Sequence, residues 1–183
     1  MTSNPQKSMN PFEILGISPS FSMTPDEVQR AYLAKLSAAH PDLAASGTLD
    51  PVDPATLNTA RDTLLDDEAR ASLMLEILNG PSASDHTLPD GYLMEMMELR
   101  TQIEEELEEN PDEARPRWQA WADSRARDTV KEISALFESI ESASPDQAEG
   151  IKLLIRTQLN AWRYTNRLIE QLDPTYDPSS ADF

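Results

Sequence analysis

Residues 24–42 have the sequence TPDEVQRAYLAKLSAAHPD, which predicts an amphipathic helix with a defined start and a defined end. Thr24 and Glu27 form a capping box, in which each side chain satisfies a backbone N–H at the helix start. Apolar residues then recur every three or four positions, as one buried helix face requires: Val28, Tyr32, Leu36 and Ala39. The helix is expected to end near Ala39, because a residue before proline is pushed out of the α region and His40-Pro41-Asp42 follows.

The rest of the chain predicts further helices separated by prolines and glycines. With only 5 glycines and many Ala, Leu, Glu and Gln, the composition favours an all-α fold. Short helices are predicted at 11–15, 55–65 and 68–78, and longer ones at 92–109, 114–142 and 145–172. The expected organisation is a first module at 9–80, a Ser/Pro/Asp/Gly-rich linker at 81–91, a three-helix bundle at 92–172 and a frayed tail at 173–183.

The charge and cysteine content of the chain restrict the possible functions. A formal charge of −18 disfavours binding to nucleic acid or to acidic membranes, because both are negatively charged. The absence of cysteine excludes disulfides, thiol catalysis and cysteine-based metal sites within this chain. There is no long apolar run, signal peptide or transit-peptide pattern at the N-terminus, so we expect a cytoplasmic protein.

Two motifs together point to a known family. The tripeptide His40-Pro41-Asp42 after an amphipathic helix, with NPFEILG at residues 10–16 upstream, resembles a J-domain, formed by an antiparallel helix pair with short helices. The sequence GYLMEMMELR at residues 91–100 is similar to the start of the C-terminal three-helix bundle of HscB-type co-chaperones of iron–sulfur cluster assembly. The resemblance implies two partners: an iron–sulfur scaffold protein of the IscU type, and a 70-kDa heat-shock chaperone of the HscA or DnaK type, whose ATPase is stimulated.

The resemblance assigns chaperone binding to His40, Pro41 and Asp42, together with the basic residues Arg30 and Lys35 of the preceding helix. Family members commonly carry a longer series of Arg and Lys along this helix, facing an acidic chaperone surface. Because charge steers association, having only two basic residues predicts weaker or slower engagement, or a chaperone with a less acidic face. An alternative interpretation is that His40 merely ends a helix and interacts with its dipole.

The client-binding prediction covers Leu93, Met94, Met97 and Tyr164. In the helix at 92–109, the core stripe is Tyr92, Met96, Leu99, Ile103 and Leu107, and the first three predicted residues lie beside it. They form either a widened core stripe or an exposed apolar patch suited to a partner, for which flexible methionines are well adapted. Tyr164, like Leu168, lies away from the core stripe of the last helix and corresponds to an aromatic client contact of the family; the alternative is an ordinary surface tyrosine.

No catalytic, cofactor or metal site is predicted. His40 and Asp42 could in principle act as a general base and its orienting partner, but the chain offers no nucleophile or oxyanion element at a matching spacing. The acidic run Glu104–Glu106 is expected to be a solvated face. The remaining alternatives are a J-domain adaptor for a different client, and a helical interaction protein with no link to a chaperone.

Overall fold

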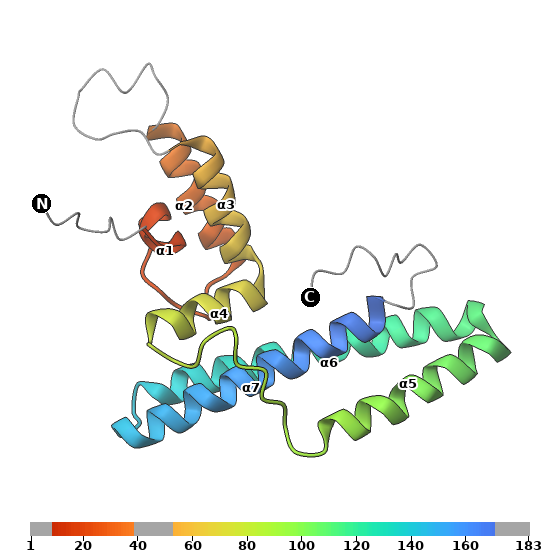
Figure 1. Ribbon diagram of the computed structural model, residues 1–183. Helices are drawn as coiled ribbons and strands as arrows, with labels where there is room; N and C mark the ends of the chain where they lie inside the picture. Colours follow the sequence, from red (N-terminus) through yellow and green to blue (C-terminus); the bar gives the residue numbers. More distant parts are fainter. Residues whose placement is uncertain (1–8, 39–52, 171–183) are drawn as a thin grey trace, which may run out of the picture. The chain divides into compact units, whose positions relative to one another are not determined.

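The computed structural model of the chain describes residues 9–38 and 53–170, and these residues contain helices and no strands. The all-α fold class is therefore confirmed. Internal contacts divide the chain into two compact units, Met1–Met74 and Leu75–Phe183 (Figure 1). The boundary between them lies within a helix, whereas the sequence placed the linker at 81–91; the sequence-based domain limits stay predictions.

The first unit is built on three helices, α1 (Pro11–Leu15), α2 (Pro25–Ala38) and α3 (Pro54–Leu65). Asn10 and Glu13 form a reciprocal capping box at the start of α1, with both bonds at 3.0 Å. Gly16 ends α1 with a φ of 70°, a left-handed conformation that glycine adopts without penalty. At the start of α2, the Thr24 N–H donates to the Glu27 carboxylate at 2.7 Å and the Glu27 N–H donates to the Thr24 hydroxyl at 3.3 Å, as the sequence predicted.

Helices α2 and α3 lie side by side and run antiparallel. In the middle of α2, the Tyr32 hydroxyl donates to the Asn58 side chain at 2.7 Å. Before α2 begins, the backbone of Phe21 accepts from Arg70, which also donates to the carbonyl of Leu64 at the end of α3. Apolar side chains at the centre of this unit are almost completely buried: Phe12, Leu15, Val28, Leu57 and Leu64. Helix α4 (Asp67–Ile77) follows α3 after a single residue.

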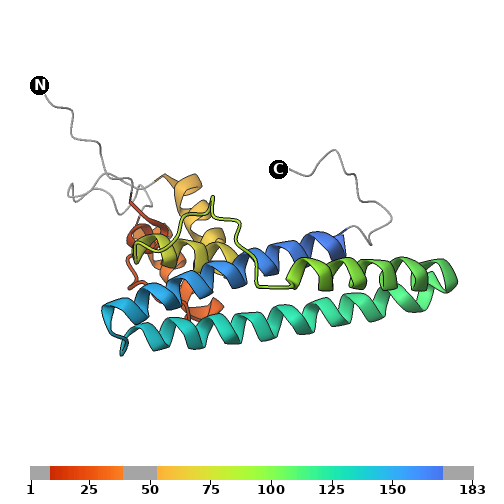
Figure 2. The same cartoon turned by 60° about the horizontal axis from the view of Figure 1, so that its bottom comes forward.

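The second unit is a bundle of α5 (Tyr92–Glu109), α6 (Pro111–Ile140) and α7 (Pro145–Glu170). At about 1.5 Å per residue, α5 spans about 27 Å and α6 about 45 Å, so α5 accompanies only part of the α6–α7 hairpin (Figure 2). Helix α6 begins three residues earlier than predicted. Pro111 occupies its first turn, where no backbone N–H is needed, and the Asn110 carbonyl accepts from the Ala114 N–H at 3.0 Å.

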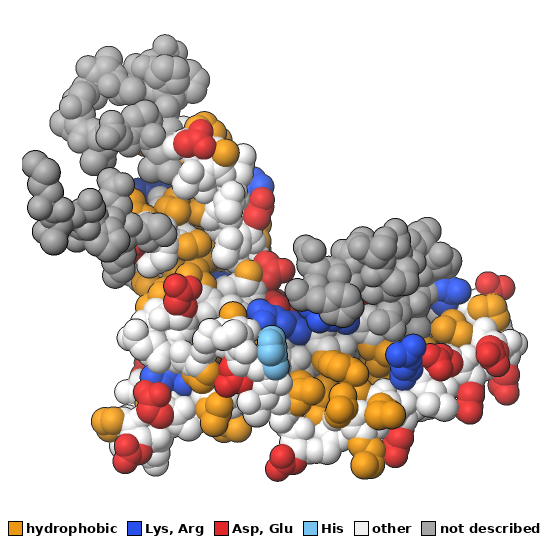
Figure 3. Space-filling view, viewed as in Figure 1, with side chains coloured by type: hydrophobic (Ala, Val, Ile, Leu, Met, Phe, Trp, Pro, Cys, Tyr) orange, Lys and Arg blue, Asp and Glu red, His pale blue; other side chains and the backbone are white. Residues whose placement is uncertain are grey.

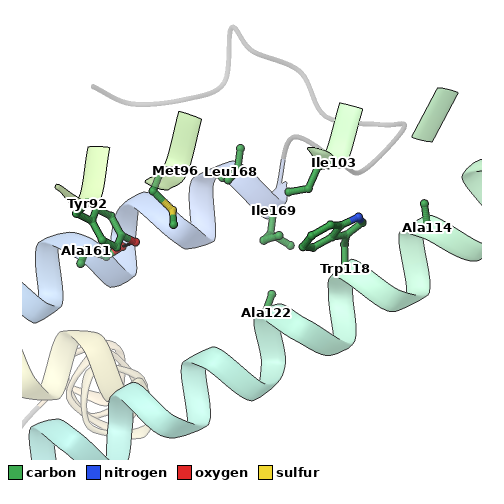
Figure 4. Packing of buried hydrophobic residues seen from close by; sticks show 9 residues of the cluster. All are labelled: Tyr92, Met96, Ile103, Ala114, Trp118, Ala122, Ala161, Leu168 and Ile169. Atoms are coloured by element: carbon green, nitrogen blue, oxygen red, sulfur yellow. Dashed lines mark hydrogen bonds between the residues drawn. The ribbon is translucent and has the colours of Figure 1, made fainter. Parts of the chain in front are cut away.

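The core of the bundle contains side chains from all three helices (Figure 4). Tyr92 and Met96 of α5 point toward Ala161 of α7, while Trp118 of α6 lies close to Ile169 of α7. The Trp118 indole N–H donates to the Glu106 carboxylate at 2.9 Å, so one residue of the acidic run packs against the bundle and is partly buried. The prediction of a solvated face at Glu104–Glu106 was wrong at Glu106, whose side chain is 24% exposed, because the buried indole N–H requires an acceptor.

Residues 78–91 connect α4 to α5, and the part at 78–87, called here the strap, is held along α7 by side chains of α7 that donate to its backbone carbonyls. Lys152 donates to the carbonyl of Leu78 at 3.0 Å, and Arg156 donates to that of Pro81 at 3.3 Å. One turn further on, the Asn160 amide donates to the carbonyls of Asp85 at 2.8 Å and Thr87 at 3.0 Å. These three α7 side chains are buried, so most of the segment predicted as a linker is anchored within the second unit.

Candidate partner-binding sites

The first turns of α5 present three large apolar side chains to solvent. Leu93 is 51% exposed, Met94 is 69% exposed and Met97 is 64% exposed. Hydrophobic side chains gather over the N-terminal half of α5 in the space-filling view, with acidic side chains at their margin (Figure 3). On angle alone these residues could have widened the core stripe; the structure places them on the surface.

Tyr164 of α7 joins these residues through the buried ring of Tyr92. The two tyrosine rings pack edge to face, with centroids 6.2 Å apart and an angle of 82° between the planes. The contact with Tyr92 places Tyr164, which is 39% exposed, on the side of α7 that faces α5. Leu93, Met94, Met97 and Tyr164 are hereafter called the apolar patch.

Hydrogen bonds of Tyr92 fix the start of α5 on α7. Its hydroxyl donates to the carbonyl of Ala161 at 2.7 Å and contacts the hydroxyl of Thr165. Burial raises the pKa of the Tyr92 phenol above its ordinary value, because the phenolate would lose its hydration. Gly91 precedes the helix with a φ of 76°, which allows the sharp entry into α5.

Charged groups border the apolar patch. Arg100 forms an ion pair with Glu104 one turn along α5, at 2.8 Å. The hydrogen bond that Arg100 donates to the Glu104 carboxylate raises the pKa of the Arg100 guanidinium, so this group stays a cation. An apolar centre with a polar margin is the usual composition of a protein–protein interface.

The packing of Leu168 in α7 differs from its sequence-based description. Leu168 was expected to lie away from the core, beside Tyr164, but it is only 7% exposed. Leu168 belongs to the hydrophobic cluster that also contains residues of α5. Because α5 covers this face of α7, more than one stripe of α7 is buried. The angular positions of residues around α7 alone do not reveal that α5 packs against a second face of this helix.

The residues predicted to bind the chaperone are only partly described. His40, Pro41 and Asp42 lie outside the described residues. Arg30 is exposed on α2, and its Nε donates to the carbonyl of Asp26 at 3.2 Å. The Lys35 side chain is partly buried and lies over Gly16 at the end of α1: a β-carbon at position 16 would come 2.9 Å from its Cε.

Two features were missed in the sequence analysis. The buried polar series Lys152, Arg156 and Asn160 has a spacing of four residues, so its members share one face of α7, and this regularity could have indicated a polar contact. Leu33 and Leu36 on α2 are 49% and 36% exposed, although Leu36 was assigned to the buried stripe. Whether Leu36 is buried depends on the position of α3, which cannot be inferred from the sequence of α2.

Comparison with solved structures identifies the fold. Chaperone HscB from Vibrio cholerae matches with a TM-score of 0.65 and 22% sequence identity, over 90% of this chain and 96% of that chain. The fold is that of HscB. The structure of the human co-chaperone protein HscB also matches with a TM-score of 0.65 and 22% identity, over 92% of this chain and 82% of that chain.

The likeness therefore lies in the three-dimensional arrangement, over nearly the whole chain. No protein-family model matches the sequence, and no curated protein matches it either. The resemblance inferred from the two sequence motifs is confirmed as a shared HscB fold. Among the described helices, none combines the length and the hydropathy needed to cross a membrane.

Proposed function

We propose that this chain is a co-chaperone that binds an iron–sulfur scaffold protein of the IscU type and delivers it to a 70-kDa heat-shock chaperone of the HscA or DnaK type. The HscB fold supports a co-chaperone role, and the order of the two motifs in the sequence supports the two partners. The chain would perform no catalysis of its own, since the ATPase it stimulates belongs to the chaperone. Binding client and chaperone together raises the concentration of one near the other.

The observation that carries the client assignment is the exposure of the apolar patch beside a core that is already filled. Tyr92, Met96 and Ile103 of the same helix are 5%, 3% and 1% exposed, so α5 has its full buried face without Leu93, Met94 or Met97. Exposing three adjacent large apolar side chains is unfavourable unless a partner covers them. Tyr164 would add an aromatic anchor, a residue type enriched among energetically dominant interface contacts.

The client assignment is tested by titrating an IscU-type scaffold against the full chain by calorimetry. The double variant Leu93→Ala/Met97→Ala is expected to weaken binding by at least about tenfold, because interface anchors contribute more than about 1 kcal/mol each. A matched control is Leu153→Ala/Leu154→Ala, which removes two leucines of α7 with similar exposures of 47% and 53% outside the patch. Equal affinities for all three proteins would rule out the patch as the client site.

The chaperone assignment is tested by measuring ATP hydrolysis by HscA-type and DnaK-type chaperones in the presence of the chain. We expect stimulation by the wild type and none by His40→Gln, because the tripeptide assigned to chaperone contact loses its imidazole. Stimulation that persists in the variant would remove the J-domain assignment. In that case a helical interaction protein without a chaperone partner becomes the better description.

A further inference from the structure

The exposed surface of α2 carries leucines in the region where the chaperone is proposed to bind. Leu33 and Leu36 are 49% and 36% exposed and lie one helical turn apart. The helix packs on α1 and α3 through Val28 and Tyr32, which are 1% and 8% exposed. Leu33 is therefore not needed to complete the core of this unit.

The cations of α2 are poorly placed to attract an acidic partner. Lys35 is directed toward Gly16 and the end of α1, where its charge lies near backbone carbonyls. Arg30 is exposed, but Asp26 and Glu27 lie within the preceding turn, and Arg30 donates to the backbone of Asp26. The capping hydrogen bonds from Thr24, and to a smaller extent the charge of Arg30, lower the pKa of Glu27, which keeps this neighbouring carboxylate negatively charged. The solvent-facing surface of α2 thus has no excess of positive charge.

The position of α2 in the chain brings this surface near the residues proposed to contact the chaperone. Ala38 is the last residue of α2, and successive Cα atoms are about 3.8 Å apart. A protein that contacts residues 40–42 is therefore within reach of the last two turns of α2, where Leu33 and Leu36 lie. The exposed leucines give that protein an apolar contact where ion pairs are few.

We infer that Leu33 and Leu36 dock on an apolar surface of the 70-kDa chaperone, so that association with the chaperone depends little on ionic strength. This inference rests on the proposed function and adds the chemistry of the interface to it. Ion pairs at an interface margin weaken as salt shortens the range of the electrostatic interaction. Burial of leucine removes apolar area from water, and moderate salt does not weaken that contribution.

The test measures the chain concentration that gives half-maximal stimulation of the HscA-type and DnaK-type ATPases, at about 50 mM and about 200 mM NaCl. For Leu33→Ala, that concentration should rise about fivefold at both salt concentrations, since about half of a leucine side chain is still available for burial. For the wild type, it should change less than about twofold between the two salt concentrations. Leu65→Ala on α3, which removes a leucine with 38% exposure, is the matched control and should behave as wild type.

The possible results separate this inference from the proposed function. If His40→Gln abolishes stimulation but Leu33→Ala has no effect, or if wild-type stimulation falls steeply with salt, the co-chaperone role stands and the apolar docking is wrong. If the wild type stimulates neither chaperone, both are wrong. Sedimentation of a wild-type dimer that Leu33→Ala converts to a monomer would assign the leucines to self-association instead. Equal thermal melting of wild type, Leu33→Ala and Leu65→Ala shows that the comparison concerns folded proteins.

Discussion

At the scale of single residues, Tyr92 connects the fold of the bundle to its surface. Its ring is 5% exposed and lies in the core, while its edge-to-face contact supports the exposed ring of Tyr164. Its hydroxyl bonds to the Ala161 carbonyl on α7. The position of the apolar patch thus depends on a residue that is itself inaccessible to a partner.

We expect Tyr92→Phe to lower the free energy of unfolding by about 1–2 kcal/mol, because the Thr165 hydroxyl and the Ala161 carbonyl lose a buried partner. The wild type should also lose stability as the pH rises above about 10. The phenol pKa is raised in the folded state, so the unfolded chain releases this proton first and alkaline pH favours unfolding. Urea unfolding at neutral and alkaline pH measures both effects. Tyr164→Phe is the control, and equal alkaline destabilisation of Tyr92→Phe and wild type would contradict the prediction.

The two faces of α5 make a second prediction at this scale. Ile103 is 1% exposed and Met97 is 64% exposed. Ile103→Ala should destabilise the chain by about 2–5 kcal/mol through loss of burial and creation of a cavity, whereas Met97→Ala should change stability by less than about 0.5 kcal/mol. Chemical denaturation of the two variants checks this. A large destabilisation by Met97→Ala would mean that the patch contributes to the core.

At the scale of elements, α7 contacts three different neighbours along its length. Its apolar residues meet α6 and α5, and Lys152, Arg156 and Asn160 bond to the strap. This explains why a helix of 26 residues has buried side chains on several faces in addition to one stripe. Hydrogen bonds from α7 side chains to its backbone hold the strap in place. The sequence of the strap itself gives little indication of these bonds.

Asn160→Ala should release the C-terminal part of the strap. The variant loses the bonds to the carbonyls of Asp85 and Thr87, which are 2.8 and 3.0 Å long in the structure, and we expect a loss of about 1–3 kcal/mol in stability. Hydrogen exchange of the backbone amides at 84–88 should become faster. Asn166→Ala, at a partly buried asparagine of the same helix, serves as the comparison. Unchanged exchange at 84–88 would show that Asn160 does not hold the strap.

The positions of the helices along the chain could be predicted from the sequence, but which helices pack against one another could be predicted less well. The capping box at Thr24 and the prolines between helical segments are local signals, and the predicted helix starts lie within about three residues of the observed ones. The exposure of Leu36 and the burial of Leu168 depend on α3 and α5, which lie elsewhere in the chain. For the same reason, the angular position of Leu93 around α5 does not decide whether it is exposed. Its exposure depends on where α7 packs against α5.

At the scale of the whole molecule, the HscB fold is matched at 22% sequence identity. Two short motifs carried the resemblance in the sequence, and the structural match covers 90% of the chain. The formal charge of −18 belongs to the entire chain and opposes compaction, because like charges are closer together in the folded state than in the unfolded state.

Added salt should therefore stabilise the protein. Raising NaCl from about 20 mM to about 500 mM screens the repulsion between carboxylates, and we expect the thermal midpoint to rise by about 3 °C. Differential scanning calorimetry measures this shift, and KCl should give the same result if screening is the cause. A midpoint that falls or stays constant would show that favourable ion pairs, which salt also weakens, outweigh the repulsion.

The way in which the strap is held has a consequence for how this protein tolerates mutation. Lys152, Arg156 and Asn160 donate hydrogen bonds to main-chain oxygens of the strap, and the Asp85 carboxylate is also attracted by Arg156. The side chains at positions 82, 83 and 84 are exposed, so a randomised library at these three sites should yield mostly functional proteins. Randomising the three α7 positions should yield few. Evolutionary drift would then be rapid in the connecting segment and slow on the helix beneath it.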